Sequence, residues 1–423
     1  MSEWKDTEIG LLPKDSELKE LGDCINLIID HRGKTPIKLG SDWVDSGIPA
    51  ISAKNIHGGR LTDKESIRYV THEIYKKWMK EDVKKGDCFL VSEGATLGEY
   101  LYWDFDFPIV LSQRLFCIRT NPNVLYSKYF YAYMTSVNFQ KQVFARATGS
   151  SVGGLRQTEV LRLKIPILPM DKQKIIGDLL YDVDRKQRLL EIQNETLEAI
   201  AQTLFKHWFI DFEFPNAHGK PYKSSGGAMI PSELGGIPEG WRVGKLGDVA
   251  RVINGRAYKQ TEFREEGTPI VRIQNLTGKG STVYSDLLLD EDKYISAGDL
   301  IYAWSATFGS YIWRGAKSIY HYHIWKLDCF SKLFKYYLHI HLKRVSDSVQ
   351  GQGTGSIFTH ITKTLMENQE LYIPDKQTMK KWDAIVNPIF DKIMTNFNQL
   401  QTLTKTRDAI LPKLMSGQLR VKE

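Results

Sequence analysis

Two long heptad stripes constrain the fold of this chain of 423 residues more than any other feature. Apolar side chains recur at alternating four- and three-residue steps between residues 171 and 207, and again from Trp382 to Leu414. This spacing places them on one face of a helix, and a helix of that length spans roughly 50 Å at about 1.5 Å per residue. Because each stripe needs an apolar partner, we expect the two helices to pack together as an antiparallel coiled coil.

Polar residues interrupt both stripes at seam positions. An Asn buried in a coiled coil fixes the register of its helices at a cost in stability. The predicted seam residues of this helix pair are Ile176, Leu180, Val183, Asn194, Leu197, Leu204, Ile389, Ile393, Asn396, Leu400 and Leu403.

Length and composition predict a globular protein of two or three domains. The net charge of +7 is mildly basic and favours a polyanionic partner. The four cysteines are scattered without metal-ligand spacing, so we expect free thiols in a reducing compartment. No run of about 18 apolar residues and no apolar leader occurs, which predicts a cytoplasmic protein that is neither secreted nor membrane-spanning.

The two halves of the chain repeat each other. The tripeptide Leu-Gly-Asp at 21–23 recurs at 246–248, and Asp-Lys-Gln at 171–173 recurs at 375–377, so the offset falls from 225 to 204 residues. Other shared motifs keep their order between these points. Each half is therefore one unit, a globular part of short strands and helices followed by a long helix, with loops of different length.

This repeat predicts an α/β (α+β) fold with two similar mixed-sheet domains, joined by the antiparallel helix pair and related by pseudo-twofold symmetry. A segment rich in Gly, Pro and Ser follows the first helix and is predicted to be a linker. The predicted divisions are a first domain at 1–169, the central helix at 170–212, the linker at 213–240, a second domain at 241–374, and the C-terminal helix and tail at 375–423.

Motifs for catalysis or metal binding are incomplete in this sequence. The tetrapeptide at 387–390 resembles the adenine-binding motif of methyltransferases, but Ile389 replaces a Pro and belongs to the heptad stripe. The Glu-x-Lys at 291–293 lacks the upstream acidic residue of a metal-dependent nuclease, and the glycines at 351–355 are not followed by the Lys of a phosphate loop. We expect no catalytic residue, no metal site and no cofactor bound by this chain.

Basic and amide side chains cluster in loops at equivalent places in both halves, which favours DNA binding. Arg and Lys can bond guanine O6 and N7, Asn and Gln can bond adenine N6 and N7, and Gly lets the backbone approach phosphate. The candidate DNA-binding residues are His31, Arg32, Lys34, Lys54, Asn55, His57, Arg60, Gln113, Arg114, Thr148, Ser150, Ser151 and Arg156 in the first half, and Asn254, Arg256, Tyr258, Lys259, Arg272, Gln274, Asn275, Gln352, Thr354 and Ser356 in the second.

Two dipeptides are the preferred base readers. Lys54-Asn55 and Gln274-Asn275 each follow a strand that begins with Gly-x-Pro, so they occupy the same place in the two halves. Two copies of one reader in a single chain suit the recognition of two separated half-sites on duplex DNA.

The order and duplication of these motifs resemble those of the specificity subunits of Type I restriction-modification systems, over essentially the full length. The shared marks are Leu-Gly-Asp at the start of each half, the segments 47–56, 86–87 and 169–173 with its counterpart 374–377, the Thr-Gly-Ser loops at 148–150 and 354–356, and the segments 204–212 and 411–419.

This resemblance implies a non-catalytic subunit whose two target recognition domains each select one part of a bipartite DNA target, with the helix pair setting the gap. It implies two methyltransferase subunits, docked on the helices, that methylate adenine N6, and permits restriction subunits that cleave DNA. S-adenosylmethionine, ATP and Mg would then be bound by the partner subunits.

Two other functions are compatible with parts of the sequence. A scaffold protein would explain the heptads but not the duplicated basic loops. A self-sufficient DNA methyltransferase or nuclease would need the cofactor and metal motifs that are incomplete here.

Overall fold

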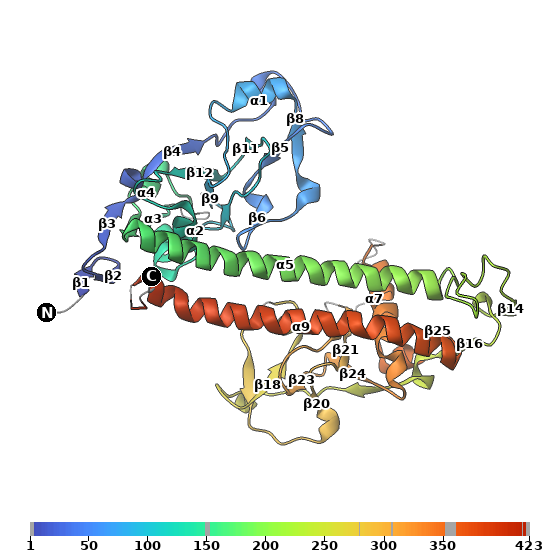
Figure 1. Ribbon diagram of the computed structural model, residues 1–423. Coiled ribbons are helices and arrows are strands. Elements are labelled where there is room, and N and C mark those ends of the chain that lie inside the picture. Colours follow the sequence, from blue (N-terminus) through green and yellow to red (C-terminus); the bar gives the residue numbers. More distant parts are fainter. Residues whose placement is uncertain are drawn as a thin grey trace. The chain divides into compact units, whose positions relative to one another are not determined.

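The computed structural model describes residues 4–148, 153–278, 280–305, 308–351, 361–416 and 418–419 (Figure 1). The chain divides into two compact units. Unit 1 comprises Met1–Leu189 and Leu400–Glu423, and unit 2 comprises Leu190–Gln399. Both units therefore contain part of each long helix, α5 (Met170–Phe209) and α9 (Lys376–Met415).

Unit 1 is built on a four-stranded antiparallel sheet of order β10-β9-β12-β4 and a three-stranded mixed sheet of order β11-β5-β8. Its elements before α5 are β1 (Trp4–Thr7), β2 (Gly10–Pro13), β3 (Glu17–Glu20), β4 (Ile25–Asp30), β5 (Ile48–Ile51), β6 (Ile56–His57), β7 (Arg60–Leu61), β8 (Arg68–Val70), α1 (His72–Trp78), β9 (Cys88–Val91), β10 (Tyr100–Tyr102), β11 (Val110–Leu111), β12 (Leu115–Thr120), α2 (Ser127–Met134), α3 (Val137–Arg146), α4 (Gln157–Leu161) and β13 (Lys164–Ile167).

Unit 2 has an antiparallel sheet of order β17-β24-β21-β22 and a mixed sheet of order β19-β18-β23-β20. Its elements between the long helices are β14 (Met229–Ser232), β15 (Gly235–Pro238), β16 (Arg242–Lys245), β17 (Ala250–Asn254), β18 (Thr268–Val271), α6 (Ile273–Leu276), β19 (Val283–Ser285), β20 (Tyr294–Ile295), β21 (Leu300–Ala303), β22 (Gly309–Ile312), β23 (Ser318–Tyr320), β24 (Ile324–Cys329), α7 (Lys335–Gly351), α8 (Lys363–Glu367) and β25 (Glu370–Ile373).

The predicted repeat and the α/β fold class are confirmed strand by strand. The strands β4, β9, β10 and β12 correspond to β17, β21, β22 and β24, and the sheet orders match. Each mixed sheet contains one parallel pair, β5 with β11 and β18 with β23. The pairs β3–β13 and β16–β25 also match, so both units have one topology.

The segment 213–240, which the sequence predicts to be a linker, is a folded part of unit 2. Its β14–β15 hairpin repeats the β1–β2 hairpin of unit 1. Phe214 is buried, and its ring stacks on Tyr222 at 4.6 Å and on Trp241 at 5.1 Å. Gly and Pro mark turns here rather than a flexible chain, because aromatic residues between them supply a core.

The predicted seam residues are buried or partly buried within each unit. In unit 1 the start of α5 packs on the end of α9, where Leu180 and Leu414 share one core. In unit 2 the end of α5 packs on the start of α9, where Phe209 and Trp382 share one core. Near the middle of the two helices Asn396 is fully buried, and its Nδ2 donates to Asn194 Oδ1 at 2.8 Å. The expected Asn thus occupies the seam and pairs with a second Asn across it.

The cysteines are free thiols, as predicted. Cys24, Cys88 and Cys117 are buried, and Cys329 is partly buried. Burial raises the pKa of the Cys88 and Cys117 thiols well above the usual range, so both stay protonated in the core.

Unit 2 is expected to lose stability in mild acid because helix α7 contains the buried His339 and the partly buried His341. Burial, aided by Lys343, lowers the pKa of His339 to about 3, and burial lowers that of His341 to about 4, against 6.5 for an ordinary histidine. Their contribution is complete above pH 6.5 and is lost as pH falls from 6.5 towards 4, because only the unfolded chain binds these protons in that window.

We expect the free energy of unfolding of unit 2 to fall by about 1.4 kcal/mol per pH unit for each of these histidines. Urea unfolding of the chain at pH 7.5, 6 and 5 measures this slope. His339→Gln removes one of the two groups that bind a proton only in the unfolded chain, so the slope should fall by about 1.4 kcal/mol per pH unit. Carboxylates that titrate in the same window are unchanged in this variant. An identical slope in the variant would contradict the prediction.

Candidate nucleic-acid interface

Loops from four separate parts of unit 1 meet at one end of its four-stranded sheet. The Ser92 amide after β9 donates to Arg114 O at 2.9 Å, and the Leu155 amide donates to Ser92 O at 2.7 Å. The Ala53 amide donates to Gln113 O at 3.1 Å. These backbone bonds bring the predicted loops around residues 54, 113 and 156 into one surface, which we call the reading edge of unit 1.

Three exposed cations lie on this reading edge. Lys54, Arg114 and Arg156 are all exposed, and the side chains of Lys54 and Arg114 keep 59% and 55% of their accessible surface. Arg114 has a φ of 65°, a left-handed conformation that is uncommon for a residue with a side chain and is typical of functional loops. Its guanidinium lies 3.3 Å from Glu93, a solvent-exposed pair that a phosphate or base can replace at little cost.

Two other predicted cations of unit 1 serve its own structure. Arg32 forms a bidentate pair with Asp30 at 2.7 and 2.9 Å and lies over the ring of Phe116 at 4.3 Å. Lys34 Nζ donates to Trp78 O at 2.7 Å, and burial lowers the pKa of Lys34. Both residues are half-buried and have partners within unit 1, so their contact with DNA stays a prediction.

The asparagines of the two preferred dipeptides hold local turns through their side chains, and Asn55 is buried while Asn275 is partly buried. Asn55 is 1% exposed, and its Oδ1 accepts from the Ser52 amide at 3.0 Å. In the same way, Asn275 Oδ1 accepts from the Arg272 amide at 2.9 Å. Asn favours turns because its side chain bonds the nearby backbone, so the repeat here reflects a shared turn. Only Lys54 and Gln274 of the two pairs are exposed.

The remaining candidates of unit 1 differ in exposure. Gln113 and Thr148 are exposed, while Arg60 and His31 are half-buried. Burial lowers the pKa of His31, which keeps its ring neutral. His57 is exposed and its Nδ1 lies 2.9 Å from Glu99. Ser150 and Ser151 lie outside the described residues, as do Gln352, Thr354 and Ser356 of the second half.

Unit 2 has a reading edge on the same backbone frame. The Trp304 amide donates to His323 O at 3.1 Å, as Ser92 does to Arg114. The His321 amide donates to Val271 O at 2.9 Å, which repeats the bond from Ser112 to Ile51 O at 2.8 Å. Trp304 therefore replaces Ser92, and Tyr322 and His323 replace Gln113 and Arg114.

The predicted residues of unit 2 are partly engaged. Arg256 is paired with Glu262 at 2.7 Å and lies over the half-buried Tyr258 ring at 5.1 Å. Arg272 donates to Ser281 O at 2.8 Å. Asn254, Lys259 and Gln274 are exposed and remain candidates for DNA contact.

Sequence reasoning missed Trp304, Tyr322 and His323. They line an open hollow of about 590 Å³ on unit 2, together with Asn254 and Trp325. Their side chains are mostly aromatic and lack the basic and amide groups that predict base reading. The repeat does indicate them, since Tyr322 and His323 stand before β24 as Gln113 and Arg114 stand before β12.

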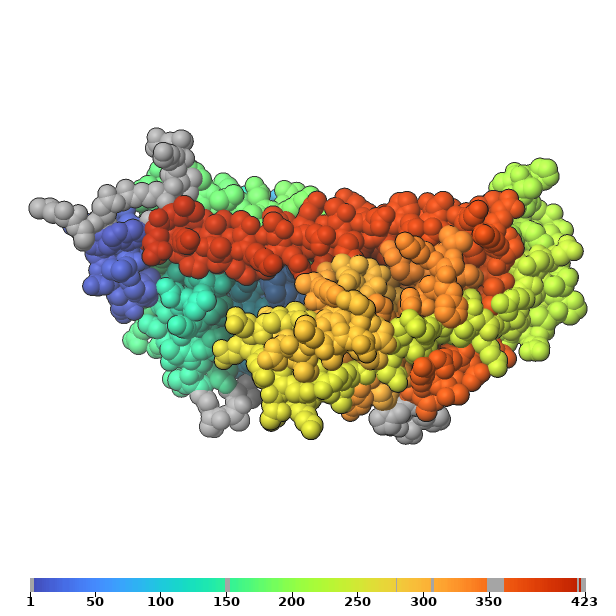
Figure 2. Space-filling view, turned by 90° about the horizontal axis from the view of Figure 1, so that it is seen from below, coloured from blue at the N-terminus to red at the C-terminus, as the bar shows by residue number. Residues whose placement is uncertain are grey.

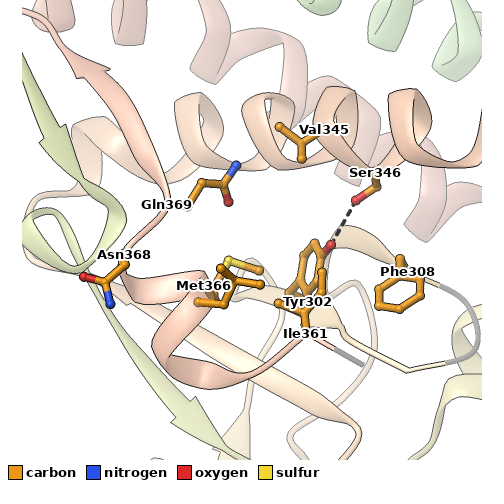
Figure 3. A pocket seen from close by; sticks show the side chains of 9 residues that line it. Tyr302, Phe308, Val345, Ser346, Ile361, Met366, Asn368 and Gln369 are labelled. Carbon is orange, nitrogen blue, oxygen red and sulfur yellow. Dashed lines mark hydrogen bonds between the residues drawn. The ribbon is translucent and has the colours of Figure 1, made fainter. Parts of the chain in front are cut away.

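A second cavity, of about 260 Å³, lies in unit 2 and is lined mainly by apolar side chains (Figure 3). Its polar groups include the Tyr302 hydroxyl, which lies 3.1 Å from Ser346 Oγ. The residues that line this cavity are Tyr302, Phe308, Val345, Ser346, Ile361, Leu365, Met366, Asn368 and Gln369.

No group of three or more His, Cys, Asp or Glu side chains is placed to hold a metal ion in the part of the chain that the structure describes.

The chain matches the family model of the Type I restriction modification DNA specificity domain twice, at residues 13–199 and 238–408. The two matched ranges agree with the two copies of one topology in the structure. The chain belongs to the family of Type I restriction-modification DNA specificity subunits. This membership confirms the resemblance found in the sequence.

Relatives and solved structures agree with this membership. The MjaIX specificity subunit of Methanocaldococcus jannaschii is 28% identical over all of this chain and 98% of its own length. The HindI specificity subunit of Haemophilus influenzae is 23% identical over 80% of this chain and 88% of its own. A Type I S subunit from M. genitalium has the same fold, with a TM-score of 0.60, 15% identity and coverage of 94% and 96%.

Within the described ranges, no helix combines the length and the apolar character that a bilayer span requires.

Proposed function

We propose that this chain reads a bipartite DNA target, with one half-site contacted by the reading edge of each unit. The observation that carries this proposal is the shared backbone frame, in which equivalent hydrogen bonds hold Ser92 with Arg114 and Trp304 with His323. Because the same backbone arrangement occurs in both units and holds an exposed loop in each, the chain can present base-reading side chains to two half-sites.

The two reading edges carry different side chains and should select different sequences. Unit 1 presents Lys54, Gln113 and Arg114, which can bond guanine or adenine in the major groove. Unit 2 presents Gln274 and Tyr322 at the equivalent places. An asymmetric pair of half-sites follows from this difference.

The outward face of α5 is the proposed docking surface for two N6-adenine methyltransferase subunits. Five apolar side chains on this helix are exposed, and their helical spacing keeps most of them on one face. Helix α9 offers less apolar surface, although it forms a continuous red band at the surface in Figure 2. The exposed apolar residues of α5, with fractions from 37% to 59%, are Ile175, Leu179, Leu189, Ile192 and Ile200.

In this proposal the chain selects the site and its partners perform the chemistry. Methylation with S-adenosylmethionine belongs to the methyltransferase subunits. ATP- and Mg-dependent cleavage belongs to restriction subunits where they are present. The reading edges supply cations, amides and aromatic rings, which bind DNA without breaking its bonds.

Genome-wide mapping of N6-methyladenine tests this function. Cells that express the cognate methyltransferase subunit should show a gapped two-part methylated motif only when this chain is also present. Unchanged methylation, with the methyltransferase shown to be active, would contradict DNA selection and favour a scaffold that only holds the partners together.

A further inference from the structure

The reading edge of unit 2 is aromatic where that of unit 1 is polar. Trp304 and Trp325 lie 5.5 Å apart with ring planes 19° from parallel, and the Tyr322 and His323 rings are 3.9 Å apart. Tyr322 keeps 40% of its surface exposed beside the hollow of about 590 Å³. A large aromatic side chain left this exposed is a candidate for contact with a ligand.

The strand register fixes which residues of the two units are equivalent. Asp30 pairs with Phe116 in unit 1, and Asn254 pairs with Trp325 in unit 2. The backbone amides of Ser92 and Trp304 also donate to equivalent carbonyls, those of Arg114 and His323. Together, the strand pairs and these bonds show that the hollow of unit 2 occupies the place of the polar reading edge of unit 1. The backbone is conserved between the units, while the chemistry of the side chains has changed.

The hollow combines the ring surfaces of Trp304 and Tyr322 with polar groups at its margin, from Asn254, Thr362 and Lys363. The indole N–H of Trp304 already donates to Tyr322 O at 2.8 Å, so this residue presents only its ring. Among the base edges of the major groove, thymine alone carries an apolar group, the C5-methyl, and apolar side chains read it by contact. Arg114 in the equivalent loop of unit 1 is instead suited to guanine O6 and N7.

We propose that Trp304 and Tyr322 are specificity-determining residues that select thymine at one position of the half-site read by unit 2, by enclosing its C5-methyl group. This inference rests on the proposed function, since it requires that unit 2 reads DNA. It goes further by naming the base and the chemical group that are recognised.

Deoxyuridine substitution tests the inference, because uracil differs from thymine only by this methyl group. The complex of the full chain with its methyltransferase subunits is titrated with duplexes that carry the methylated motif, with each thymine of the second half-site replaced in turn. At one position, binding should weaken about fourfold, the loss expected when one buried methyl group is withdrawn.

The variant Tyr322→Ala should bind the thymine duplex more weakly and lose its discrimination against uracil at that position. Trp304→Ala provides a second test at the other wall of the hollow. Phe330→Ala, an exposed aromatic residue at the opposite end of β24 from Tyr322, is the matched control and should keep the fourfold discrimination. Circular dichroism and binding to the first half-site show that each variant is folded.

Three results would overturn the inference while leaving the proposed function intact. One is a second half-site without any thymine on either strand. Another is wild-type binding that tolerates uracil at every position, and a third is unchanged discrimination in both Tyr322→Ala and Trp304→Ala. Failure of the wild-type complex to bind the methylated motif in preference to other DNA would instead contradict the proposed function.

Discussion

Replacing Lys54, Arg114 and Arg156 together by alanine is expected to weaken binding to the specific DNA site by about 100-fold or more. All three are exposed on the reading edge of unit 1, and each can contact phosphate or a base. A single good contact to a base is worth about 1–3 kcal/mol, so the loss of three exceeds a factor of 100 even at the lower end. Titration of labelled duplex with the assembled methyltransferase complex measures this loss.

The three single variants separate two kinds of contact. Arg114→Ala should relax the sequence preference at one position of the first half-site, because Arg can read guanine directly. Lys54→Ala and Arg156→Ala should weaken binding equally on all sequences if they contact phosphate. Each lost phosphate contact lowers the slope of log affinity against log salt by about 0.9.

A control with the same change in charge replaces Lys14, Lys19 and Lys172, which lie around β3 and the start of α5 away from the reading edge. We expect less than a threefold effect on specific binding. Equal losses in the two triple variants would show that net charge, rather than the reading edge, controls affinity. Unchanged binding by the variant that lacks Lys54, Arg114 and Arg156 would contradict the assignment of these three residues to DNA contact.

Replacing Trp382 by alanine is expected to lower the free energy of unfolding of unit 2 by about 3–5 kcal/mol, the usual cost of removing a buried aromatic side chain. Trp382 on α9 is fully buried. Its ring centroid lies 4.9 Å from Phe209, 5.8 Å from Trp208 and 6.1 Å from Phe205, all on α5. The substitution therefore opens a cavity where the helix pair joins the core of unit 2.

Hydrogen exchange resolved by peptide measures this effect in each unit. Amides of unit 2 should exchange faster in Trp382→Ala, while those in the unit 1 sheet keep their protection. Ile385→Ala, on the same helix and 42% exposed, is the matched control and should change stability by less than about 0.5 kcal/mol. Similar protection in both variants would contradict the prediction.

The helix seam and the repeat were predictable because both are encoded in local spacing. Apolar residues every three or four positions define the buried face of α5 and α9, whatever surrounds them. The repeated Leu-Gly-Asp tripeptide marks a short helical turn after β3 and after β16. Hydrophobic burial follows the pattern of a segment, so sequence periodicity determined the elements and their order.

The roles of single polar residues depended on neighbours that the sequence does not place. Lys34 and Trp78 are 44 positions apart, yet the Lys34 ammonium donates a hydrogen bond to the Trp78 carbonyl, which the sequence does not predict. Trp304 and His323 join through a backbone bond between strands, which reveals the reading edge of unit 2. The sequence by itself determined two copies of one α/β unit with a shared helix pair. Only the tertiary structure decided which of the candidate side chains are exposed and which are buried, because burial depends on neighbours that lie far apart along the chain.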